Sequence, residues 1–217
     1  MEAPNRVEIM KYIFINPVVD KLHEKRKLNE LLLQKGYQRV EVKTDWHGIV
    51  KEKYNELLKD TNLTIIDRRC PKTIEMVSAY IDDASVLAHS IEPILIHCAI
   101  ELSEREDLKD RKKIITTPCE SLASYGNKIG LKDTEFISWK TFLKLIDSDR
   151  KLQVRSLEAS PIPPGYFESL NAKASSISGK EMIEDYFKKN LHKQYELVEV
   201  LYCYNGCHNG DGVLIDE

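Results

Sequence analysis

The sequence of 217 residues lacks several features that would assign it to a class at once. It has no run of about 18 consecutive apolar residues, the length that a membrane-spanning helix needs. It has no basic segment followed by an apolar one near Met1, so we expect no secretory signal and a cytoplasmic location. It also has no basic excess, because 32 Lys and Arg stand against 35 Asp and Glu, so nucleic acid is not an expected partner.

Internal repeats and low-complexity tracts are absent as well. The hydrophobic fraction of 42% and the charged fraction of 31% are those of a globular protein rather than a disordered one. A chain of this length can bury a hydrophobic core without disulfides. We therefore expect one unit over residues 1–217, either undivided or built from two lobes at about 1–85 and 86–217 that share one metal site.

Short apolar segments alternate along the chain with segments of helical periodicity. Strands are predicted over residues 12–19, 39–43, 63–66, 111–117, 135–138 and 196–202. Helices are predicted over residues 20–35, 47–59, 72–80, 91–102, 139–146 and 178–190. This alternation predicts an α/β fold of open, mainly parallel sheets flanked by helices. The proline-rich segment 156–166 is the clearest loop.

Five cysteines are spread over the chain, and in a reducing compartment we do not expect an odd set of thiols to form a disulfide framework. Cys70, Cys119 and Cys203 each follow the end of a predicted strand, and Cys207 comes four residues after Cys203. Because ligands bind at the carboxyl ends of the strands in open α/β sheets, these four thiols should converge there. Cys98 lies within an apolar helical segment and is expected to be a core residue.

Four converging thiolates form a site for a soft metal centre. Structural zinc sites usually draw on two close cysteine pairs, but here only Cys203 and Cys207 are close in sequence. A [4Fe–4S] cluster takes one thiolate on each iron, so scattered single ligands suit it. A helix beginning at Pro71 would also favour the thiolate of Cys70. We predict a [4Fe–4S] cluster on Cys70, Cys119, Cys203 and Cys207, between the two α/β halves, and zinc stays open as an alternative.

Three short motifs surround these cysteines: Ile66–Pro71 (IDRRCP), Pro118–Cys119, and Val200–Gly212 (VLYCYNGCHNGDG). Together they resemble the catalytic-domain signatures of the iron-only ([FeFe]) hydrogenases, over roughly residues 60–212. The resemblance implies that the four cysteines hold a [4Fe–4S] cube. It also places Cys207 at the position that in this family bridges to a two-iron centre, where hydrogen is made or split.

Several positions depart from the pattern of the family. Arg69 stands where the family has its proton-carrying cysteine, and Leu122 stands where it has the lysine that holds a cyanide of the two-iron centre. Asp211 interrupts the final run of glycines, and the ferredoxin-like cysteines of the family's N-terminus are missing. A leucine cannot donate a hydrogen bond, and an arginine does not release its proton. We therefore expect a compact hydrogenase-like protein that keeps the cube, lacks the two-iron centre and does not turn over hydrogen.

Three functions stay open for such a protein. It is either a redox module that passes electrons to a partner protein, or an enzyme in which the space next to Cys207 receives a small-molecule substrate or a sulfur species. The third is a structural role, in which the thiolates only hold the sheet edges together. Arg69, Glu120 and His208 are the candidate catalytic residues, Arg69 together with Arg68 as a bidentate site for an anionic substrate. The alternative for the two arginines is that they pair with surface carboxylates or offset the negative charge of the cluster.

Overall fold

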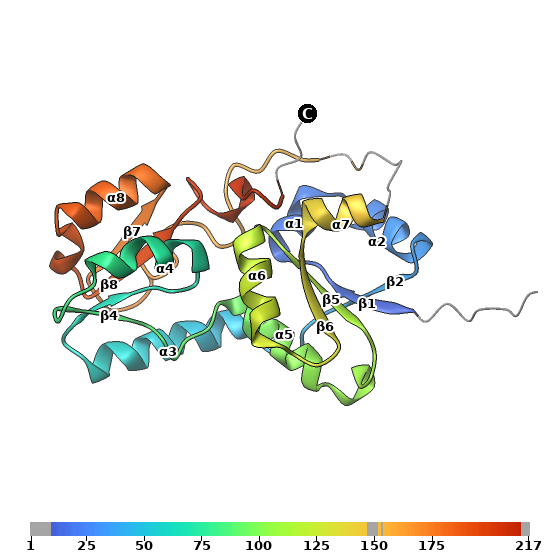
Figure 1. Ribbon diagram of the computed structural model, residues 1–217, viewed down its shortest axis with the longest axis horizontal. Helices are drawn as coiled ribbons and strands as arrows, with labels where there is room; N and C mark the ends of the chain where they lie inside the picture. The colour runs from blue at the N-terminus through green and yellow to red at the C-terminus, as the bar shows by residue number, and fades with distance from the viewer. Residues whose placement is uncertain (1–9, 147–151, 153, 214–217) are drawn as a thin grey trace, which may run out of the picture.

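The computed structural model describes residues 10–146, 152 and 154–213, which form two parallel sheets surrounded by helices (Figure 1). The first sheet has the order β2–β1–β5–β6, with strands Tyr37–Val40, Lys11–Phe14, Lys113–Thr117 and Thr134–Ser138. The second has the order β4–β3–β8–β7, with strands Ser85–Leu87, Thr64–Ile66, Leu197–Leu201 and Ala174–Ser178. The predicted α/β class, with open parallel sheets flanked by helices, is confirmed.

The chain alternates between the two sheets. The strands β1 and β2 lie in the first sheet, β3 and β4 in the second, β5 and β6 again in the first, and β7 and β8 again in the second. Each consecutive pair forms a local strand–helix–strand unit, and the pairings of β1 with β5 and of β3 with β8 join these units into sheets. The two sheets are therefore interleaved along the sequence, and a division near residue 85 does not separate them.

The described helices are α1 Pro17–Leu22, α2 Lys25–Gln34, α3 Trp46–Asp60, α4 Pro71–Val77, α5 Ile94–Glu104, α6 Glu120–Ile129, α7 Trp139–Leu145 and α8 Lys180–Lys188. Four of these eight, α1, α3, α6 and α7, begin at a residue whose side chain caps the helix. The carboxylate of Asp45 accepts a hydrogen bond from Gly48 N at 3.1 Å and starts α3. Gly130, at a left-handed φ of 74°, ends α6.

Some elements differ from the prediction. The strand expected over 12–19 ends at Phe14, because Asn16 Oδ1 accepts from Val18 N at 2.8 Å and Pro17 begins α1. The helix expected over 20–35 is broken at His23, which is extended. The strands β4 and β7 and the helix α6 were not predicted. Both missed strands are edges of the second sheet; β4 is only three residues long, and β7 (ASSIS) has three serines, so neither has the apolar alternation of a half-buried strand.

One hydrophobic cluster connects the two sheets. It contains Phe14 of the first sheet and Ile65 of the second, together with residues of α5. In α5, Ile96, Ala99 and Leu102 are completely buried. The sheets therefore share part of their core, which fixes the ends of their strands relative to one another. None of the described helices is long and apolar enough to span a bilayer.

His192, in the 3₁₀ turn Leu191–Gln194, makes the stability of the fold depend on pH. Its ring is completely buried and stacks on Phe187 at 4.6 Å, and neither nitrogen has a hydrogen-bond partner among the described residues. Burial and then the nearby Lys193 lower the pKa of His192, against the opposing effect of Asp82. The folded state therefore keeps the ring neutral at a pH where the unfolded chain takes up a proton.

We expect the free energy of unfolding to fall as the pH drops below about 6.5, the ordinary pKa of histidine. His192→Phe keeps the stacking and removes the titrating group, so part of this acid loss should disappear. Urea unfolding of both proteins at pH 7.5 and at pH 5.5 measures the difference. The variant should lose less stability between the two pH values than the native chain, and equal losses would contradict this account.

Candidate functional site

Each predicted cysteine ligand follows the carboxyl end of a strand, as expected. Cys70 follows β3 and is the N-cap of α4, and Cys119 follows β5 and is the N-cap of α6. The Cys119 Sγ accepts a hydrogen bond from Leu122 N at 3.4 Å. Cys203 and Cys207 follow β8, in a segment that runs from the second sheet toward the first, past the start of α6 (Figure 1).

The four thiols line one small cavity, together with Pro118 and the glycines of the last cysteine loop. Burial raises the pKa of Cys119 to about 12 and that of Cys203 to about 11. It also raises the pKa of Cys207, and negative charge on the other three cysteines raises it further. Cys98 does not line this cavity, and it is a buried residue of α5, as predicted.

Two glycines allow the last cysteine loop to lie directly on the Cys119 turn. A Cβ on Gly210 would lie 2.3 Å from the carbonyl oxygen of Pro118, and a Cβ on Gly212 would lie 2.8 Å from Cys119 Cα. Gly212 N donates to the same Pro118 oxygen at 3.1 Å. The absence of a Cβ at these two positions therefore permits the close contact between the last cysteine loop and the Cys119 turn.

Gly210→Ala should destabilise the protein and disturb the site, because the clash is with backbone and cannot be relieved by turning a side chain. We expect a loss of about 1–3 kcal/mol in the free energy of unfolding, the usual cost of overpacking. Gly48→Ala is the matched control, since its new methyl group meets the movable Asp45 carboxylate. Urea unfolding of both variants measures the effect, and equal stabilities would show that the loop does not need the close approach.

Four thiols are soft donors, of the kind that bind zinc or an iron–sulfur cluster. No group of three or more His, Cys, Asp or Glu among the described residues is arranged to hold a metal ion. A [4Fe–4S] cluster spreads its four thiolates over four irons, so the ligands do not meet at one point. Four thiols around one cavity at strand ends therefore fit an iron–sulfur cluster.

A second, larger pocket of about 210 Å³ lies against the same cysteines and shares Cys70, Cys119 and Cys207 with the first cavity. Its walls come from the strand ends of both sheets, from α5 and from the loop after residue 159, and they are mainly apolar. Leu122 and Arg69 both line it. Two of the positions at which the sequence departs from the hydrogenase motifs therefore line one pocket.

Comparison with known proteins agrees with this architecture. No protein-family model and no curated protein matches the sequence. The structure matches that of a variant of the [FeFe]-hydrogenase HydA1 from Chlamydomonas reinhardtii, with a TM-score of 0.56 and 12% sequence identity, over 99% of this chain and 82% of that chain. The chain has a hydrogenase-like fold. At this identity the likeness concerns the fold alone.

Arg69 is fully engaged within this hydrogenase-like fold. Its guanidinium pairs with Asp67 at 3.0 Å and with Glu199 at 2.5 Å, and all three side chains are at most 7% exposed. The rings of Tyr166 and Phe167 lie 4.2 and 4.4 Å from its central carbon. Arg69 therefore has a structural role. Two carboxylates of the chain itself pair with the guanidinium that was proposed from the sequence to bind an anion.

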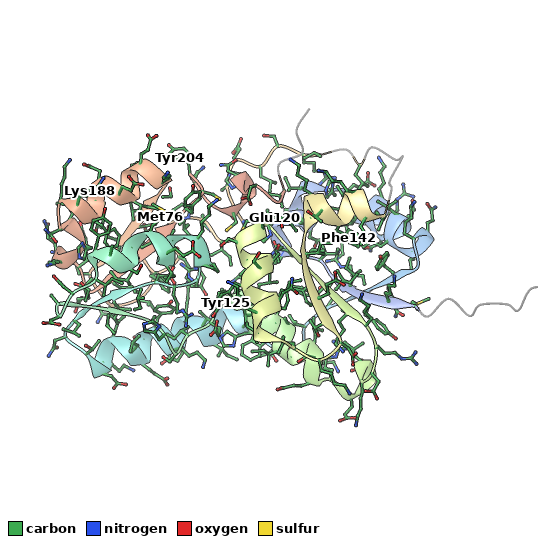
Figure 2. All side chains as sticks on the ribbon, viewed as in Figure 1. Met76, Glu120, Tyr125, Phe142, Lys188 and Tyr204 are labelled. Carbon is green, nitrogen blue, oxygen red and sulfur yellow. The ribbon has the colours of Figure 1, made fainter. Side chains whose placement is uncertain are left out.

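The other candidates also have local partners. Arg68 donates to the carbonyl of His89 at 2.6 Å and to Tyr125 on α6 at 3.0 Å, and it does not line the large pocket. Glu120, at the start of α6, accepts hydrogen bonds from Ser138 and from Thr141, the latter at 2.9 Å (Figure 2). Both side chains therefore have hydrogen-bond partners within the chain.

His208 is buried beside Cys207, but it lines neither the cysteine cavity nor the large pocket. Its Nε2 lies 3.3 Å from the side-chain nitrogen of Asn209, and its Nδ1 has no partner among the described residues. The structure therefore places it behind the cysteine loop and not at a reacting surface.

Sequence reasoning missed three residues that shape the site. Glu199 and Asp67 hold Arg69, and Ser160 lines the large pocket. Glu199 had a visible signal, because a carboxylate in the middle of the apolar strand Leu197–Leu201 needs a buried partner. Ser160, within the proline-rich loop, had none.

Proposed function

We propose that this protein binds one [4Fe–4S] cluster through Cys70, Cys119, Cys203 and Cys207 and serves in the cytoplasm as a redox module for a partner protein. The observation that carries the proposal is the single cavity lined by all four thiols at the strand ends of a hydrogenase-like fold. When bound, such a cluster supplies reversible one-electron transfer.

The surroundings of the cysteines support a redox role over hydrogen chemistry. The side chain of Leu122 has no hydrogen-bond donor, and Arg69 is held by two buried carboxylates, so neither side chain offers the support that a two-iron centre has in the hydrogenase motifs. The side of the cavity at Cys203 lies near the surface, because the next residue, Tyr204, is 68% exposed (Figure 2). The distance that an electron travels from the cluster to a protein docked at this side would therefore be short.

Metal analysis tests the proposal directly. We expect about four irons and about four acid-labile sulfides per chain in protein purified without oxygen. Stoichiometric zinc without sulfide would overturn the proposal and leave a structural thiolate site. A redox module should in addition show reversible reduction of the cluster in a spectroelectrochemical titration.

A second candidate function is favoured by the large pocket. In an enzyme, this pocket against Cys207 would receive a small substrate next to the cluster. Added small molecules should then change the absorption or magnetic spectrum of the cluster, whereas the spectrum of a simple electron carrier should not respond. The chemistry of the pocket walls indicates which molecules to test.

A further inference from the structure

Asp211 lies in the last cysteine loop, between the two glycines that pack on the Cys119 turn. The backbone on both sides of it is fixed, because Gly212 N donates to the carbonyl of Pro118 and Gly210 N donates to the carbonyl of Cys207, each at 3.1 Å. Its side chain is 51% exposed. The loop therefore holds a carboxylate at the solvent side of the cysteines.

This carboxylate contacts the two other segments that carry cysteines. Its Oδ1 accepts a hydrogen bond from the backbone N–H of Glu120, the residue after Cys119, at 3.2 Å. Its Oδ2 lies 3.7 Å from the Nζ of Lys72, which comes two residues after Cys70. Asp211 itself belongs to the third segment, the last cysteine loop. One side chain therefore links all three segments that supply the four thiols.

Lys72 brings the opposite charge to the same place. Its Nζ lies 4.1 Å from the centre of the ring of Tyr202, the residue before Cys203. Burial is the main cause that raises the pKa of Cys119 and of Cys203, and the charge of Asp211 raises both further. Lys72 acts in the opposite direction on the pKa of Cys203. The two charges therefore have opposite effects on the thiols of the site.

Fixed charges at such a site act on the reduction potential of a cluster. A cluster gains one negative charge when it is reduced, so a nearby carboxylate disfavours the reduced state and a nearby ammonium favours it. Arg69 also lines the space next to the cysteines, but two buried carboxylates already offset its charge. Asp211 and Lys72 are both partly exposed, and each can be changed without leaving a buried charge.

We infer that Asp211 lowers the reduction potential of the cluster on the four cysteines, and that Lys72 limits this effect. The inference deepens the proposed function and rests on it, because it names the residues that set the potential of the redox module. Asp211 interrupts the final run of glycines in the hydrogenase motif, so its charge is a feature of this chain. Because both side chains are partly exposed, added salt should weaken their effects.

The experiment uses the full chain purified without oxygen, in which iron and acid-labile sulfide are counted before the potential is titrated. Asp211→Asn keeps an oxygen that can accept from Glu120 N and removes the charge. We expect it to shift the equilibrium toward the reduced cluster about 2- to 10-fold, which raises the potential by about 20–60 mV at 59 mV per tenfold. Lys72→Gln should lower the potential, and the double variant should return toward the native value.

Two further variants separate the charge of Asp211 from its linking role. Asp110→Asn is the matched control, because it breaks an ion pair with Lys132 that lies before the amino end of β5, whereas Cys119 follows the carboxyl end. It should shift the equilibrium less than about 1.5-fold. Asp211→Ala should raise the potential as Asp211→Asn does, and it should also lose iron to a chelator faster, because the hydrogen bond to Glu120 is lost. The potential is measured on the clusters that remain, so partial loss of iron does not prevent the titration.

An unchanged or lower potential in Asp211→Asn overturns the inference and leaves Asp211 as a structural link alone. A shift of equal size in Asp110→Asn overturns it as well. These results differ from a failure of the proposed function. Protein with about four irons and four sulfides whose potential ignores Asp211 keeps the cluster and loses the inference, whereas zinc without sulfide overturns both.

Discussion

Cys203→Ser is expected to lose more than about half of its iron, whereas Cys98→Ser keeps the full amount. A serine hydroxyl is a far poorer ligand for iron in a cluster than a thiolate, and Cys203 lines the cavity with the other three thiols. Cys98 lies in α5, outside that cavity, so its sulfur is not expected to touch the cluster. Iron and acid-labile sulfide per chain, determined without oxygen, measure the difference.

The control, Cys98→Ser, makes the same chemical change as Cys203→Ser, but outside the cavity that the four thiols line. Burial raises the pKa of Cys98 to about 12, so this thiol is a neutral group in an apolar helix. A serine there buries a hydroxyl and should lower stability without lowering the iron content. Circular dichroism shows whether both variants are folded. If the two variants lose iron equally, the assignment of the ligands is wrong.

The strand ends that carry the cysteines could be predicted from local sequence. β3, β5 and β8 are short apolar runs, and a cysteine follows each of them within four residues. Because ligands bind at the carboxyl ends of parallel strands, this pattern was enough to predict that Cys70, Cys119 and Cys203 lie at one site. The convergence depends on placement at strand ends and not on which strands share a sheet.

The division into sheets could not be predicted in the same way. Local periodicity shows that β1 is followed by β2, and β5 by β6, but nothing in either unit states that β1 pairs with β5. Such pairing depends on contacts between residues about 100 positions apart. For example, the backbone N–H of Asn16 donates to Thr116 Oγ1 at 2.8 Å. The alternation of the chain between the two sheets was therefore not predicted, while the fold class was correct.

The ion network at Arg69 illustrates a second limit of sequence reasoning. An arginine beside a predicted metal ligand has the same sequence signature whether it binds a substrate or a carboxylate of its own chain. The partners that decide between these are Asp67, two residues away, and Glu199, which is 130 residues away. Glu199 also accepts hydrogen bonds from Gly165 N at 2.5 Å and from Ser176 Oγ at 2.6 Å. Its carboxylate therefore links the proline-rich loop, at Gly165, to β7 and β8.

Arg69→Leu is expected to cost about 3–5 kcal/mol of the free energy of unfolding, because it leaves two buried carboxylates without their cation. Tyr54 continues to donate to Asp67 at 2.6 Å, but a neutral hydroxyl cannot replace the lost charge. The rings of Tyr166 and Phe167 also lose their contact with the guanidinium. Urea unfolding at pH 7.5 measures the loss.

Two further variants show whether the loss comes from buried charge. Lys132→Leu removes a cation from an ion pair whose side chains are 75% and 67% exposed, and it should leave the stability unchanged. Glu199→Gln in the Arg69→Leu background removes one of the unpaired charges and should restore more than about 1 kcal/mol. If Arg69 instead served to bind an anion, its removal would leave the fold stable, and the second substitution would restore nothing. The sign of this coupling therefore decides between an arginine that holds the site together and one that waits for a substrate.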